Sequence, residues 1–140
     1  MNVQARVLPA IDVTGWSANL LADPEFRLIA RWSHFALRLV AGADALDLRV
    51  SPGGLSLVRT PAPSTDDETI VLEGSDAAWR AFLAPEPVAP DHSVLGMDRR
   101  RDDFTIAQGR ETMIRNLRTF ALVMTVLRQT FNANGPERTG

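Results

Sequence analysis

The chain has 140 residues, of which 45% are hydrophobic, and a formal net charge of −2. This length suits one domain with a sizeable core, and the apolar content excludes a disordered chain. The small negative charge argues against a nucleic-acid partner, and the absence of cysteine, lysine and tyrosine excludes disulfides, thiolate nucleophiles, Schiff bases and phenol chemistry.

Targeting and membrane segments are not indicated by the sequence. No N-terminal stretch combines a basic region with an apolar run and a cleavage site. The longest apolar run, Phe120 to Leu127, contains Thr125 and is too short to span a bilayer. We therefore expect a cytoplasmic protein with a single domain over residues 1–140, no transmembrane segment and no cofactor.

The first predicted elements are helical. Residues 1–22 carry apolar side chains without a clear period, so we expect a packing segment with short helical turns. Asp23-Pro24-Glu25 predicts a helix start, because aspartate caps, proline suits the first position and glutamate suits the first turn. The helix is expected to run to about His34. Its predicted apolar side comprises Phe26, Ile29, Ala30 and Ser33.

From Phe35 the hydrophobic period becomes strand-like. Apolar side chains alternate in three runs, over residues 35–41, 46–50 and 55–59, and glycine-containing turns join the runs. This pattern is typical of an antiparallel meander with one solvated face. A polar, proline-broken loop over residues 61–68 precedes a fourth predicted strand, Thr69 to Glu73.

Helices and one more strand complete the chain. Ser75 is the predicted N-cap of a second helix that stops before the prolines of residues 85–90, and residues 92–101 are expected to form a loop or short helical turn. A fifth strand, Phe104 to Gln108, then leads through Gly109 into one long helix. Residues 132–140 are expected to be a flexible tail. The predicted fold is α+β: a five-stranded, mainly antiparallel sheet with helices packed on one face and a long C-terminal helix.

Three stretches of this order resemble the sterol carrier protein family of small lipid-binding domains. They are the meander ending in Val50-Ser51-Pro52-Gly53-Gly54, the strand-to-helix unit Thr69 to Trp79, and the strand Phe104 to Gln108 with Gly109. The resemblance covers roughly Ile29 to Gln129. Arg110 departs from the family pattern, which has an acidic residue after this glycine. The resemblance implies a hollow between sheet and helices that holds an acyl chain, a sterol or a similar apolar molecule.

An apolar stripe on the last helix agrees with such a hollow. Its side chains recur at three- and four-residue steps, which also suits plain core packing, so both interpretations stay open. The function expected from the resemblance is non-covalent binding or carrying of an apolar, acyl-type small molecule. The predicted lining comprises Trp79, Phe82, Leu95, Met97, Phe104, Met113, Leu117, Phe120 and Met124.

Polar candidates for this pocket are few. Asp91-His92-Ser93 is not expected to be a catalytic triad, because triad members converge from separate segments; Asp91 and Ser93 are predicted turn or cap residues. His92 follows the proline segment and is a candidate for a polar ligand contact. Arg99, in the charged run 98–103, is a candidate for a carboxylate or phosphate group. With two histidines and no cysteine, we expect no metal site and assign no catalytic residue.

Other functions remain open from the sequence. One is an interaction module that docks on a partner enzyme through residues 1–22 or an exposed sheet edge, since the resemblance includes accessory domains fused to larger enzymes. Another is a small cofactorless enzyme that uses His92 or a pocket carboxylate. A homo-oligomer is compatible with each of these.

Overall fold

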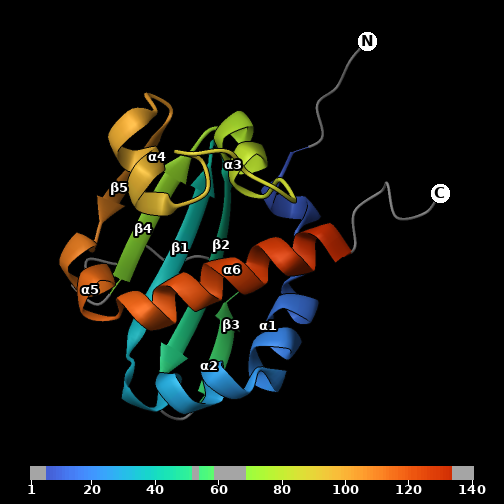
Figure 1. Cartoon of the computed structure of the whole chain (residues 1–140), viewed down its shortest axis with the longest axis vertical. Coiled ribbons are helices and arrows are strands. Elements are labelled where there is room, and N and C mark those ends of the chain that lie inside the picture. The colour runs from blue at the N-terminus through green and yellow to red at the C-terminus, as the bar shows by residue number, and fades with distance from the viewer. Residues whose placement is uncertain (1–5, 52–53, 59–68, 134–140) are drawn as a thin grey trace.

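A sheet with helices across one face forms the body of the protein (Figure 1). The computed structural model describes residues 6–51, 54–58 and 69–133. The strands are β1 (Phe35–Ala41), β2 (Asp44–Ser51), β3 (Gly54–Val58), β4 (Thr69–Gly74) and β5 (Phe104–Gln108). The helices are α1 (Val13–Ala22), α2 (Pro24–Ile29), α3 (Asp76–Phe82), α4 (Val94–Arg100), α5 (Arg110–Arg115) and α6 (Leu117–Ala133). The predicted α+β class and the long C-terminal helix are confirmed.

The sheet is mixed and has the order β3-β2-β1-β4-β5. β1, β2 and β3 form an antiparallel meander, as the alternation predicts, and β4 pairs antiparallel with β5. β4 joins the free side of β1 in parallel, with Leu37 opposite Ile70. The hydrophobic pattern did not reveal this parallel pair, because alternation predicts which face a side chain occupies but not which strand lies alongside. The predicted loop over residues 61–68 and the predicted tail from residue 134 lie outside the described residues.

The two faces of β1 differ, as the alternating pattern predicts: side chains on one face are buried, and those on the other are partly exposed. In β1, Phe35, Leu37 and Leu39 are fully buried beneath the helices. On the other face, the Arg38 guanidinium pairs with Asp47 of β2 through two hydrogen bonds of 2.8 and 2.9 Å. These two residues are direct cross-strand partners, so the ion pair also fixes the strand register.

The helix starts follow the predicted capping residues. Asp23 accepts a hydrogen bond from the Phe26 N–H, and Ser75 accepts one from the Ala78 N–H. α2 is shorter than expected: it ends at Ile29, and a 3-10 turn over Ala30–Trp32 replaces the predicted continuation to His34. The apolar side predicted for this stretch is buried throughout.

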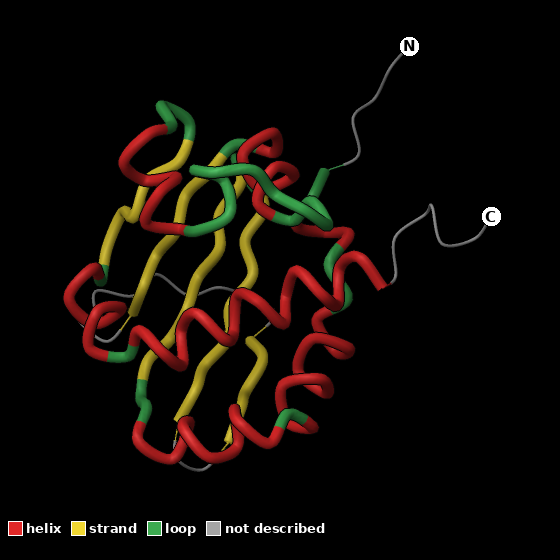
Figure 2. The backbone as a smooth tube through the Cα atoms, in the orientation of Figure 1, coloured by secondary structure: helices red, strands yellow, loops and turns green. Residues whose placement is uncertain are grey.

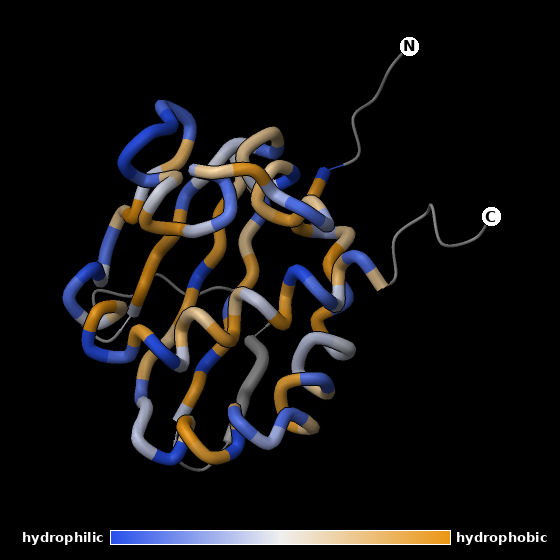
Figure 3. Tube along the Cα trace, viewed as in Figure 1, coloured by the Kyte–Doolittle hydropathy of each residue, from blue (hydrophilic) through white to orange (hydrophobic). Residues whose placement is uncertain are grey.

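The predicted single helix after Gly109 is wrong, because it is broken at Asn116. The Asn116 side chain donates to the Thr112 carbonyl at 2.9 Å, and its backbone leaves the helical region with φ −114°. An asparagine that bonds its own backbone competes with the helix in this way. Figure 2 shows the short α5 separated from α6, and α6 then crosses the helical face of the sheet. Figure 3 shows polar and apolar stretches alternating along α6.

The core lies between the sheet and these helices. The N-terminal segment contributes Val7, Leu8, Ile11, Trp16 and Leu20 to it. The indole N–H of Trp16 donates to the Val123 carbonyl of α6 at 3.1 Å, which ties α1 to the last helix. Among the described residues, no helix is long and apolar enough to cross a bilayer.

A glycine lies where β5 turns into α5. Gly109 has φ +83°, and a β-carbon placed on it would lie 2.3 Å from the Thr69 carbonyl oxygen of β4. Just before it, the β4–β5 register shifts, so that Ala107 is an extra residue between the Leu72–Ile106 and Val71–Gln108 pairs. At the predicted glycine break, the backbone of Gly109 therefore packs directly against the backbone of β4, which leaves no room for a side chain.

Candidate functional site

A small hollow opens between the end of α3, the start of α4 and one side of α6. Its volume is about 130 Å³, and we call it the α6 hollow. Apolar side chains supply most of its lining, with a few polar groups among them. The lining residues are Phe82, His92, Ser93, Val94, Leu95, Leu117, Phe120, Ala121, Met124, Thr125 and Arg128.

Local sequence features position these three walls. On α6, Leu117, Phe120, Met124 and Arg128 follow at steps of three and four residues, so they share one helical side. α4 begins at Val94 because Ser93 caps it and accepts the Gly96 N–H at 3.0 Å, as predicted for this serine. The Ser93 hydroxyl therefore fixes where the α4 wall of the hollow begins.

Arg128 has an unusual environment at the edge of the hollow. Its Nε donates to the Phe82 carbonyl at 2.7 Å, and a terminal nitrogen donates to the His92 carbonyl at 3.2 Å. The guanidinium carbon lies 4.4 Å from the centre of the Phe82 ring. Burial lowers the pKa of Arg128, because desolvation disfavours the charged form. Within the described part of the chain, no carboxylate pairs with this cation.

The structure brings together six of the residues predicted to form the site. They are Phe82, His92, Leu95, Leu117, Phe120 and Met124. Trp79, Met97 and Met113 are instead fully buried in the core and do not line the hollow. Phe104 is also buried and lies under a separate depression at the end of the sheet. Arg99 is exposed on α4 and does not reach the hollow.

Arg128 is a lining residue of the hollow that the sequence analysis does not name as a candidate. Its position four residues after Met124 places it on the same side of the helix as the predicted apolar stripe. Because a long side chain can cover apolar surface with its methylenes and keep its charged end free, an arginine fits the edge of an apolar stripe. The helical step from Met124 was the feature that could have identified it.

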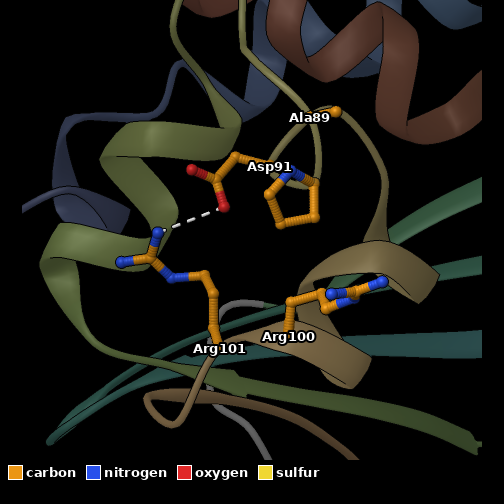
Figure 4. Close-up of a pocket in the computed structure, with 5 residues that line it drawn as sticks. Ala89, Asp91, Arg100 and Arg101 are labelled. Carbon is orange, nitrogen blue, oxygen red and sulfur yellow. Dashed lines mark hydrogen bonds and ion pairs between the residues drawn. The ribbon is translucent and has the colours of Figure 1, made fainter.

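A second, open depression lies under the proline segment (Figure 4). Arg101 in its wall donates to Asp91 at 3.1 Å and to Asp103 at 2.8 Å. Asp103 in turn accepts the Ser75 hydroxyl at 2.5 Å, and Ser75 caps α3. Figure 4 shows the Arg101 guanidinium turned towards Asp91. This cluster joins the ends of three elements, and each of its two carboxylates pairs with Arg101.

The lowered pKa of Asp103 predicts that the free energy of unfolding depends on pH. Hydrogen bonds from Arg101 and from Ser75 lower the pKa of Asp103 from 3.8 to about 2. Because the carboxylate is stabilised in the folded state, its contribution is present above the unfolded pKa and is lost as pH falls towards about 2. We expect Asp103→Asn to flatten this part of the curve of unfolding free energy against pH, measured by urea denaturation. Asp102→Asn, an equal charge change at the exposed neighbour, should leave the slope in place; equal flattening in both variants would contradict the prediction.

Asp98 covers the outer edge of β5. One of its carboxylate oxygens accepts the Ile106 N–H at 2.9 Å, and the other accepts an Arg110 N–H at 2.7 Å. Burial raises the pKa of Asp98, but these hydrogen bonds outweigh burial, and the net shift is downward. Arg110, the departure from the family pattern, thus has a local partner. An edge strand whose N–H is already bonded is a poorer template for a partner strand.

Comparisons of the chain with protein-family models, with curated proteins and with solved structures give no match, so none of them identifies the sterol carrier protein family. Among the described residues, no group of three histidines or carboxylates is arranged to hold a metal ion.

Proposed function

We propose that the protein binds a small apolar molecule non-covalently in the α6 hollow. The observation that supports this proposal is the convergence of apolar side chains from α3, α4 and α6 on one hollow that has a cation at its edge. The proposed site lies between helices. The site expected from the sequence lay between sheet and helices, where Trp79, Met97 and Met113 are packed into the core.

The volume limits which molecule enters. Ligand pockets typically begin at about 300 Å³, whereas the α6 hollow has about 130 Å³. An apolar cavity of about 150 Å³ is known to hold one benzene molecule. A sterol exceeds this space, so the proposed occupant is a one-ring or short branched molecule, or the terminus of a longer acyl chain.

The methionines allow a direct test by NMR of methyl-labelled protein. Met124 lines the hollow, whereas Met97 and Met113 are buried elsewhere in the core and serve as internal controls. Addition of toluene should shift the Met124 methyl signal in a saturable manner and leave the Met97 and Met113 signals in place. The proposal is refuted if the Met124 signal does not move, or if the Met97 and Met113 signals move with it.

Filling the hollow from within should prevent this binding. Met124→Trp adds a bulky ring at the wall, so we expect toluene binding to fall by about tenfold or more, at a stability cost of about 1–3 kcal/mol for overpacking. Binding would be followed by the shift of ring-labelled Phe120. Ile114→Trp makes the same kind of change at a side chain that is 49% exposed and remote from the lining, and it should bind as the unmodified protein does.

The docking alternative is favoured by one observation only. Trp32 and Leu28, which lie four residues apart, are 83% and 58% exposed, and exposed apolar side chains mark an interaction site where they form a patch. The routes predicted from the sequence are less open, because the described part of the N-terminal segment packs into the core and Asp98 covers the β5 edge. The enzyme alternative has little support at the hollow, since the described lining residues include no aspartate or glutamate to act with His92.

A further inference from the structure

We infer that the α6 hollow selects a carboxylic acid with an apolar group of about one ring, the carboxylate binding Arg128 and the apolar group entering between Phe82, Leu95 and Met124. Benzoate-type and short branched-chain carboxylates belong to this class. The inference rests on the proposed function, because it names the chemistry of the molecule that the same hollow takes.

The Arg128 guanidinium carries a positive charge that is not balanced among the described residues. Arg128 has five N–H donors, and its bonds to the Phe82 and His92 carbonyls use two of them. Both acceptors are neutral, so the positive charge of the half-buried guanidinium has no counter-charge within the described chain. A cation withdrawn from water is stabilised by an anion in reach, and a planar guanidinium matches a carboxylate with two parallel hydrogen bonds.

Hydrogen bonds hold the Arg128 guanidinium in a fixed position. Its two carbonyl partners flank the segment between α3 and α4, and Asn132 on the next turn of α6 donates to the Leu83 carbonyl at 2.8 Å. Arg128 therefore also completes the C-terminus of α3, which is a structural role. The two roles are compatible, since the carbonyl bonds leave other N–H groups unused. They also hold the guanidinium in place before a ligand arrives, which lowers the entropic cost of binding.

The volume of the α6 hollow is close to that needed for one aromatic ring. The partly open hollow has a volume of about 130 Å³, close to the apolar cavity of about 150 Å³ that holds one benzene ring. Thr125, at the same wall of α6, offers a hydroxyl group. Ring-sized apolar space with one cation at its edge describes a receptor for an aryl or branched alkyl carboxylate.

The test compares benzoate, benzyl alcohol and toluene on the unmodified protein, with the Met124 methyl and the Arg128 Nε–H as NMR probes. We expect benzoate to bind at least about tenfold more tightly than benzyl alcohol, the lower end of the range for a hydrogen bond to a charged group, and to shift the Arg128 Nε–H. Equal or weaker binding of benzoate overturns the inference but leaves the proposed function in place. Binding of none of the three overturns the proposed function itself.

A variant pair adds a second readout. Arg128→Gln keeps an N–H donor for the carbonyls and removes the charge, so this variant should bind benzoate no more tightly than it binds benzyl alcohol. Arg99→Gln removes an equal charge from an exposed arginine outside the hollow and should bind benzoate normally. Unchanged benzoate binding in Arg128→Gln would overturn the inference. If this variant fails to fold, the comparison of the three probes on the unmodified protein decides.

Discussion

Gly109→Ala should destabilise the protein by more than about 3 kcal/mol, as measured by urea denaturation. Two costs add at this position. A residue with a β-carbon is strained by about 1–2 kcal/mol in the left-handed region that φ +83° imposes. The added methyl would also lie 2.3 Å from the Thr69 carbonyl oxygen and 2.7 Å from the Ile70 α-carbon. Both neighbours are backbone atoms of β4 and cannot rotate away, so β5 and α5 must move.

Gly42 provides a matched control for this prediction. It too has a positive φ, +61°, but nothing lies within 4 Å of a β-carbon built on it. Gly42→Ala should therefore cost only the conformational strain, about 1–2 kcal/mol. If the two variants lose the same stability, the close approach of Gly109 to β4 contributes nothing and the prediction is wrong.

Trp79→Ala should cost about 3–5 kcal/mol, the range for removal of a buried aromatic side chain. The indole ring is fully buried, packs edge-on against Phe82 and Phe104, and donates its N–H to the Val40 carbonyl at 3.0 Å. Its removal leaves a cavity and an unpaired acceptor at the end of β1. Thermal or urea unfolding measures the loss.

A control at an exposed tryptophan makes this result specific. Trp32 is 83% exposed, so Trp32→Ala should change stability by no more than about 0.5 kcal/mol. The prediction also separates the two roles given to Trp79. A stable Trp79→Ala protein with impaired toluene binding would return this residue to the ligand lining expected from the sequence and contradict its place in the core.

Local chemistry explains which parts of the fold were predictable. Ser75 and Asp23 start helices through bonds to N–H groups three residues away, so neighbouring sequence suffices to predict them. The alternation of β1 follows from its two faces. The break at Asn116 was missed because the apolar stripe runs on through it, while the competing bond to Thr112 involves a side chain that periodicity ignores.

The sequence predicts that the site is apolar. It does not predict which apolar side chains line the hollow and which are buried in the core. Trp79 and Phe82 lie three residues apart on one helix side, and the sequence treats them alike. In the structure Trp79 is enclosed by β1 and β5, whereas Phe82 meets Arg128 at the edge of the hollow. Which of two such neighbours reaches a surface depends on the docking of α4 and α6, which is a tertiary property.

The bond between Trp16 and Val123 spans 107 positions of the chain and has a consequence for folding. The meander of β1, β2 and β3 can form from residues that are near one another in the sequence. The apolar face of the meander, however, is covered only after α6 has packed against it. Contacts between distant residues slow folding, since the intervening chain has to be closed into a loop first. During synthesis on the ribosome, an emerging chain therefore exposes this face until α6 has been made.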